Sequence, residues 1–212
     1  MAVTLTTPNT VLGALLPRDG AARLAAQIGA VILGTVALTI AAKVQVPVWP
    51  VHITLQSMVV AIIAGSLGAR LGVATIALYL AEGLSGLPVF STGGGFGYVF
   101  SPSFGFIVGW LPMAFIIGTY ADRAGSRILP LALVMLVADA VSFAFGFAWL
   151  MVVANMVLSS GGTLPAWLQG GDLATIAWNG AVQPFILWDV LKMAFAALTV
   201  AGAWSLLKRK AA

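Results

Sequence analysis

The segment Thr54–Leu84 decides how this chain crosses a membrane, because it carries Gly68-Ala69-Arg70-Leu71-Gly72 in its middle. A single helix rises about 1.5 Å per residue, so a straight helix over this segment would carry Arg70 into the centre of a bilayer. The segment therefore predicts two short helices, 54–68 and 71–84, joined by a tight turn at Arg70. One or both are expected to be tilted or to span incompletely.

Four other segments are apolar and long enough to cross a membrane, since a spanning helix needs about 20 mainly apolar residues. They are 22–42, 104–121, 129–153 and 183–207. With the interrupted pair they predict an all-α integral membrane protein of six helices, folded as one membrane domain over 1–212.

The composition excludes most other classes. Of the 212 residues, 61% are hydrophobic and 8% are charged, whereas a soluble domain has roughly 45–50% apolar and about 25% charged residues. This excludes a soluble enzyme, a disordered chain and a conventional nucleic-acid binder. The basic residues are scattered between apolar runs, so no nucleic-acid partner is expected. Because no charge precedes Arg18, we expect no cleaved signal peptide.

The basic residues predict the orientation, because cytoplasmic segments carry an excess of Lys and Arg. With both termini inside, the only basic residue in the outer segments is Lys43. The inner segments hold eight: Arg18, Arg23, Arg70, Arg123, Arg127, Lys208, Arg209 and Lys210. We therefore expect both termini in the cytoplasm.

The predicted outer loops are long and rich in glycine, proline and aromatic residues. They cover 44–52, 85–102 and 154–182. The glycines at 93–95 either let backbone approach a ligand closely or belong to a flexible connector. The 164–177 segment, near Trp167 and Trp178, could lie along the membrane interface.

Charged side chains inside the membrane mark candidate functional sites, because each is costly there. Asp189 and Lys192 are three residues apart and therefore share a helix face. The pair could bind a polar ligand beneath the outer loops or could fix helix packing. We favour the ligand site because a buried ion pair rarely adds stability over apolar packing.

Two other acidic residues have less defined roles. Asp139 lies near mid-membrane and could couple to protons, be protonated, or bond to a neighbouring helix. Glu82 lies at the outer end of the third span. The only histidine, His52, is interpreted as a loop hydrogen-bonding residue rather than a metal ligand or a pH switch.

Small residues recur every four positions along the first span, at Ala22, Ala26, Ala30 and Gly34. Such a ridge permits close helix packing in lipid. It serves either internal packing or the docking of a separate membrane subunit.

No motif of a catalytic site is present. The chain lacks the Gly-x-Ser-x-Gly elbow, the His-Glu-x-x-His pair and the Gly-x-x-x-x-Gly-Lys phosphate loop. With one histidine and no cysteine, metal binding is not expected. We predict a protein that is not an enzyme and has no cofactor, so any ATP is used by other chains.

Three strings, in order, resemble signatures of the BioY family. They are Val46-Pro47-Val48-Trp49-Pro50-Val51-His52-Ile53-Thr54-Leu55-Gln56, then Gly86-Leu87-Pro88-Val89-Phe90 before the glycine run, and Pro184-Phe185-Ile186-Leu187-Trp188-Asp189-Val190-Leu191-Lys192. The resemblance runs from about Arg23 to Leu207. The chain departs from the family pattern in Ser101-Pro102-Ser103-Phe104-Gly105-Phe106, in Asp139 and in a longer 161–179 segment.

This resemblance implies a biotin-specific S component of an energy-coupling-factor (ECF) transporter, in the cytoplasmic membrane of a prokaryote. Such a protein captures biotin outside and delivers it inward with a transmembrane coupling subunit and two ABC-type ATPases. It could also form a homo-oligomer. The alternatives are an S component for another vitamin, such as thiamine or riboflavin, and a structural or assembly protein.

The resemblance also implies roles for individual residues. Asp189 would accept a hydrogen bond from a ureido N–H of biotin, and Lys192 would donate to the ureido C=O. Backbone N–H groups of the glycine-rich loops would meet the carboxylate of biotin. The small-residue ridge would be the docking surface for the coupling subunit. Further substrate-binding residues are expected at Thr54, Gln56, Glu82, Gly94, Gly95, Tyr98 and Asn155.

Overall fold

The structure, a computed structural model, describes residues 10–17, 20–46, 53–124 and 127–211. The predicted signature residues Pro47 to His52, and Arg18, lie outside the described residues. The helices are α1 (Val11–Leu15), α2 (Gly20–Lys43), α3 (Gln56–Leu84), α4 (Phe104–Ala124), α5 (Ile128–Ser159), α6 (Leu173–Ala181) and α7 (Gln183–Ala211). Two short 3-10 helices are η1 (Phe96–Phe100) and η2 (Ala166–Leu168), and strands β1 (Gln45–Val46) and β2 (Ile53–Thr54) pair antiparallel.

The described part of the chain is an all-α bundle, which confirms the predicted class of integral membrane protein. Five of its helical stretches are long and apolar enough to cross a membrane: α2, α3, α4, α5 and 173–207. The predicted spans 22–42, 104–121, 129–153 and 183–207 lie within α2, α4, α5 and α7. Because α5 continues to Ser159, the predicted loop 154–182 begins later than expected.

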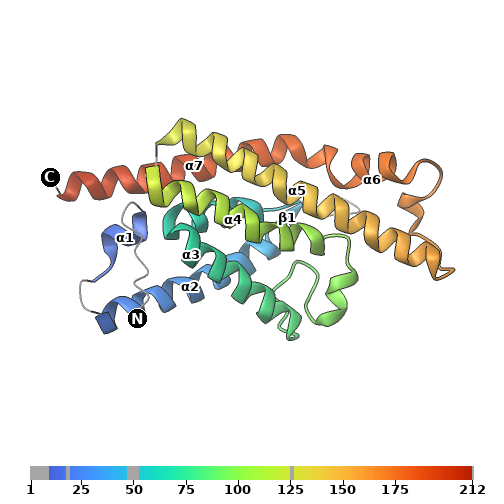
Figure 1. Cartoon of the computed structure of the whole chain (residues 1–212), viewed down its shortest axis with the longest axis horizontal. Coiled ribbons are helices and arrows are strands. Elements are labelled where there is room, and N and C mark those ends of the chain that lie inside the picture. The colour runs from blue at the N-terminus through green and yellow to red at the C-terminus, as the bar shows by residue number, and fades with distance from the viewer. Residues whose placement is uncertain (1–9, 18–19, 47–52, 125–126, 212) are drawn as a thin grey trace.

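Helix α3 is a continuous element over Gln56–Leu84, but its backbone breaks it into two helical arms. At Gly68 the backbone leaves the helical region, with φ 83° and ψ 177°. Figure 1 shows the two arms of α3 running in different directions. The arms touch closely, since a Cβ at Gly72 would lie 3.1 Å from Ala64 Cα. The predicted break is therefore present, at Gly68 rather than at Arg70.

A carboxylate stabilises this turn. Asp122, near the end of α4, accepts a hydrogen bond from the Ala69 N–H at 3.0 Å through Oδ2. A Cβ at Gly68 would overlap Asp122 Oδ1, and one at Gly118 would overlap the Ala69 backbone. Only glycine adopts a positive φ without strain, so both the backbone and the available space require Gly68.

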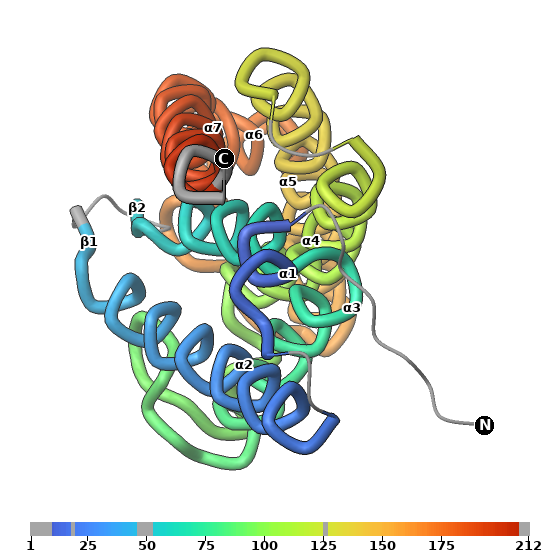
Figure 2. Tube along the Cα trace, turned by 90° about the vertical axis from the view of Figure 1, so that its left-hand side faces the viewer, coloured from blue at the N-terminus to red at the C-terminus, as the bar shows by residue number. Residues whose placement is uncertain are grey.

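The core lies between α3, α4, α5 and α7, whereas α2 packs on the far side of α3 (Figure 2). Its fully buried side chains include Val60, Tyr79, Met113, Ile117, Met135 and Val200. Glycines allow α4 and α5 to pack closely, because a Cβ at Gly109 would lie 2.8 Å from Ser142 Cα. Leu33 and Leu187 are 70% and 69% exposed, as expected for side chains that face lipid.

The glycine-rich loop between α3 and η1 folds back on the bundle. Phe90 is fully buried, with its ring centroid 5.4 Å from that of Tyr79 and 4.5 Å from that of Tyr98. Lys43, at the end of α2, donates to the Phe90 carbonyl oxygen at 2.6 Å. The loop is thus a packed element of the fold rather than a loose connector.

The segment after α5 forms a cover over the same end of the bundle. Leu168, Ala177 and Ala181 pack against Leu150 and Ala154 of α5. This cover and the glycine-rich loop lie at one end of the molecule, and α1 and the last turns of α7 lie at the other (Figure 1). The predicted position of this segment along the membrane surface stays a prediction.

Candidate ligand-binding site

A cavity of about 390 Å³ lies at the end of the bundle covered by the loops. Side chains from β2, α3, α4, α5, α7, the glycine-rich loop and the α5–α6 segment line it. Its apolar wall includes Phe106, Ile107, Trp110, Phe143 and Phe185, and its charged residues are Asp139, Asp189 and Lys192. Small-molecule sites typically have this character: a mainly apolar enclosure with a few converging polar groups.

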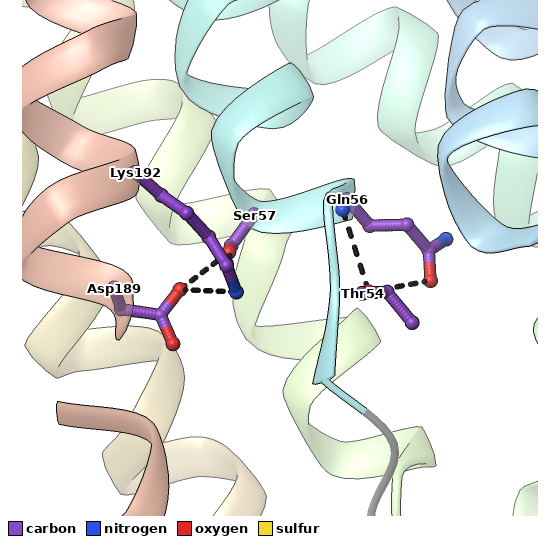
Figure 3. Close-up of polar contacts among 5 residues, drawn as sticks. All are labelled: Thr54, Gln56, Ser57, Asp189 and Lys192. Atoms are coloured by element: carbon purple, nitrogen blue, oxygen red, sulfur yellow. Dashed lines mark hydrogen bonds and ion pairs between the residues drawn. The ribbon is translucent and has the colours of Figure 1, made fainter. Parts of the chain in front are cut away.

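The predicted pair on α7 forms an ion pair at the cavity wall. Lys192 Nζ lies 3.0 Å from Asp189 Oδ1, and the two residues are only 7% and 4% exposed. Ser57, from the first turn of α3, donates to the same Asp189 oxygen at 2.5 Å, and Lys192 donates to Ser57 Oγ at 3.3 Å. Both donors use Asp189 Oδ1, and Figure 3 shows the other carboxylate oxygen pointing away from them.

Gln56 and Thr54 line the cavity and also shape the start of α3. The Gln56 N–H donates to Thr54 Oγ1 at 3.4 Å, and Thr54 Oγ1 donates to Gln56 Oε1 at 3.3 Å (Figure 3). Gln56 Nε2 donates to the Tyr79 hydroxyl at 2.7 Å, and that hydroxyl donates to the Val89 carbonyl at 2.8 Å. This chain of bonds connects the first turn of α3 to the glycine-rich loop and positions Ser57 opposite α7.

Hydroxyl groups form a second polar cluster on the cavity wall. The Tyr98 hydroxyl lies 3.1 Å from both Ser91 Oγ and Ser103 Oγ, and Ser101 Oγ lies 3.3 Å from Ser103 Oγ. All four residues line the cavity. Two of them come from the string in which this chain departs from the family pattern. The cluster offers several donors to an anionic group without a formal charge of its own.

Sequence reasoning missed Ser57, the serine cluster and Trp110 as cavity residues. Ser57 directly follows the last residue of the first signature string, Gln56, and could have been found as its neighbour. The serines and Trp110 gave no such signal, because neither residue type is unusual in a loop or a spanning helix.

Two predicted substrate-binding residues, Glu82 and Asn155, lie outside the cavity lining, and their contact with substrate stays a prediction. Glu82 accepts a hydrogen bond from Thr35 Oγ1 at 3.1 Å and so connects α3 to α2. Asn155 is exposed and donates from Nδ2 to the Met151 carbonyl one turn earlier in α5.

Gly94 and Gly95 also lie outside the lining and instead shape the loop. A Cβ at Gly94 would overlap the Leu87 carbonyl oxygen, and the Gly95 N–H donates to the Gly83 carbonyl oxygen at 2.7 Å. Their role in the structure is close backbone packing, and their contact with a ligand stays a prediction.

The small-residue ridge of α2 divides into two parts. Gly34 is buried against α3, where a Cβ would lie 2.6 Å from Thr75 Cγ2. This part serves internal packing, which corrects the prediction that Gly34 belongs to a docking surface. Ala26 and Ala30 are half-buried and Ala22 is exposed, so docking there stays a prediction.

The fold and the cavity together define a class: a helical, multi-pass membrane protein with an internal, small-molecule-sized site near one end of its bundle. Within the described residues, no group of three or more His, Asp or Glu side chains could hold a metal ion.

Comparison with known proteins identifies the family. The model of the BioY family matches residues 12–209, so the chain belongs to the BioY family. The biotin transporter BioY of Rhodobacter capsulatus is 30% identical over 167 residues, which cover 76% of this chain and 85% of that protein. That of Rhizobium etli is 32% identical over 172 residues, covering 77% and 83%. The probable biotin transporter BioY of Lysinibacillus sphaericus is 39% identical over 87 residues, covering 41% of this chain and 44% of that protein.

A solved structure shares the fold. The crystal structure of the S component for biotin from an ECF-type ABC transporter matches with a TM-score of 0.71 and 22% sequence identity. The match covers 87% of this chain and 93% of that one. The likeness supports the bundle described above.

Proposed function

We propose that this chain is the membrane-embedded biotin-binding subunit of a biotin uptake system. It captures biotin from the outer side in the cavity and delivers it inward together with an ATP-driven ECF module. The observation that carries the proposal is the buried Asp189–Lys192 ion pair, joined by the half-buried Ser57, at the wall of the cavity. Family membership and the relatives named as biotin transporters support it.

The cluster suits the ureido ring of biotin, which offers two N–H donors and one C=O acceptor. Asp189 uses Oδ1 for both of its donors, so its second oxygen is positioned to accept from a ureido N–H. An ammonium group has three donor hydrogens. Lys192 uses two, toward Asp189 and Ser57, and the third can be donated to the ureido oxygen. Charge-assisted bonds of this kind are the strong ones in a dry site.

The rest of the cavity suits the remainder of the molecule. Trp110, Ile107 and Phe143 offer apolar contact to a fused thiophane ring. The hydroxyls of Tyr98, Ser91 and Ser103 can donate to the carboxylate of the side chain. We therefore assign the carboxylate to this hydroxyl cluster rather than to the backbone of the glycine run.

The partners follow from the same proposal. The chain would dock on a transmembrane coupling subunit that carries two ABC-type ATPases, in the cytoplasmic membrane of a prokaryote. The part of α2 that holds Ala22, Ala26 and Ala30 is the proposed contact, because small side chains let a second helix approach closely in lipid. Neighbouring apolar side chains of α2, such as Leu33 and Ile40, are exposed and could join that contact.

Equilibrium binding tests the proposal directly. The purified full-length chain, reconstituted in lipid nanodiscs, is titrated with labelled biotin, and unlabelled thiamine and riboflavin are added as competitors. We expect saturable binding of biotin that neither competitor displaces. Displacement by either vitamin would indicate an S component of different specificity. A folded chain that binds none of the three would contradict the transport function.

A further inference from the structure

Asp139 is a buried carboxyl group that makes no hydrogen bond to another described residue. It lies on α5, is 5% exposed and lines the same cavity as Asp189 and Lys192. No hydrogen bond or ion pair to its carboxyl group is found among the described residues. One turn further along α5, the similarly buried Ser142 is satisfied by donating to the Phe106 carbonyl oxygen at 3.2 Å.

Neither carboxyl oxygen of Asp139 is among the fully buried side-chain atoms that lack a hydrogen bond, so both keep accessible surface to which a partner can bind. A carboxyl group placed for helix packing would be expected to bond to a neighbouring helix. Asp139 has no such bond, although α7 packs beside α5 (Figure 1). Its other surroundings are a mainly apolar groove lined by Phe143, Phe147 and Ile186 among others, in which the indole of Trp178 is the side chain with an N–H donor.

The position of Asp139 complements that of the α7 pair. Asp189 and Lys192 are close enough to act electrostatically on it. The cavity therefore presents two carboxyl groups and one ammonium group, from two helices that pack against each other.

We propose that Asp139 is a third direct contact to the head group of the ligand and accepts its second N–H. This inference rests on the proposed function. The acceptors Asp189 and Asp139 and the donor Lys192 then match the two N–H groups and the carbonyl of a cyclic urea. Asp139, which has no hydrogen bond to another described residue, gains one when the ligand binds.

Asp139 then determines which ligands this chain binds, because it requires a second N–H group on the ligand. A ligand with only one ureido N–H would leave Asp139 buried and unpaired. Sites built to bond a particular polar group reject analogues that lack it. Ligands alkylated at the corresponding nitrogen should be rejected for the same reason and also by steric overlap.

The test combines variants with ligand analogues. Full-length chain in nanodiscs is prepared as wild type, Asp139→Asn, Asp139→Ala and the control Asp172→Asn. The control changes an exposed carboxylate outside the cavity lining and keeps a side-chain oxygen for the N-cap of α6. Dissociation constants are measured for biotin and for its two mono-N-methyl ureido derivatives. Melting curves without ligand are recorded for every variant.

We expect Asp139→Ala to weaken biotin binding about 10- to 100-fold, the effect of losing a hydrogen bond to a charged group. Asp139→Asn, which keeps one carbonyl oxygen, should lose less. Wild type should reject both methylated ligands, and Asp139→Ala should cease to reject one of them. Asp172→Asn should match wild type with all three ligands.

The assignment would be overturned if folded Asp139→Ala bound biotin with wild-type affinity and still rejected both methylated ligands. Weaker biotin binding by Asp139→Ala would also overturn it if both methylated ligands were still rejected and the melting temperature fell, because that combination indicates a structural role. Wild type that fails to bind biotin would instead overturn the proposed function, together with the assignment that rests on it.

Discussion

Ser57 and Asp189 are 132 positions apart in the sequence, and Ser57 Oγ donates a hydrogen bond to Asp189 Oδ1 at 2.5 Å. This bond joins the first turn of α3 to α7 across the cavity wall (Figure 3). It occupies one carboxylate oxygen and leaves the other toward the cavity. The bond therefore orients Asp189 as well as connecting two helices.

Substitution of Ser57 should weaken ligand binding modestly. Ser57→Ala removes a donor to Asp189 and an acceptor for Lys192 while leaving both charges in place. A hydrogen bond contributes about 0.5–1.5 kcal/mol net, so we expect an affinity loss of roughly 2- to 10-fold. Titration calorimetry with biotin measures it. The control is Ser159→Ala, at an exposed serine at the end of α5, which should bind as wild type does.

Asp189 and Lys192 should act as one unit. Asp189→Asn and Lys192→Met should each lower biotin affinity by about 10- to 100-fold, since charged-group hydrogen bonds contribute roughly 1.5–3 kcal/mol. Because each change disrupts the same site, the double variant should lose less than the sum of the two. Titrations of the three variants, with their melting curves, provide the measurement. A lower melting temperature with unchanged affinity would show that the pair is only structural.

The turn in α3 should depend on Gly68. Gly68→Ala forces a side chain into a conformation that costs about 1–3 kcal/mol and places its Cβ against Asp122. We expect a clear drop in melting temperature. The matched control is Gly202→Ala in α7, where a Cβ meets nothing within 4 Å and alanine favours the helix. Equal melting temperatures for the two variants would contradict the strain at Gly68.

The two parts of the α2 ridge should respond differently to bulk. Ala26→Trp adds volume on a half-buried position and should reduce uptake by cells while the isolated chain still binds biotin. Gly34→Leu would push against Thr75 and α3 and should lower the melting temperature. Loss of binding in Ala26→Trp in parallel with uptake would place Ala26 in internal packing and would refute the docking surface.

The predicted orientation can be tested with one cysteine, because the chain has none of its own. Ser160→Cys is exposed at the end of α5. If both termini are cytoplasmic, a membrane-impermeant maleimide should label it in intact cells. Labelling only in inverted vesicles would reverse the orientation. Arg127→Cys, at the predicted inner start of α5, is the matched control and should show the opposite pattern.

The sequence by itself determined the membrane-spanning segments, the break near residues 68–72 and the Asp189–Lys192 pair. Each is a local property. Span length follows from a run of apolar residues, the break from glycines around a charge, and the pair from three-residue spacing on one helix.

Only the tertiary structure decided which side chains meet across helices. In a soluble helix, polar residues mark the side that faces away from the core. In a membrane helix, both the core side and the lipid side are apolar, so the pattern of polar residues does not show which side is buried. Met135 is fully buried and Val137 is 64% exposed on the same helix, yet both are simply apolar in the sequence. For that reason the burial of Gly34 against α3, and the position of Ser57 and Asp139 at the same cavity as the α7 pair, emerged only from the packing of the bundle.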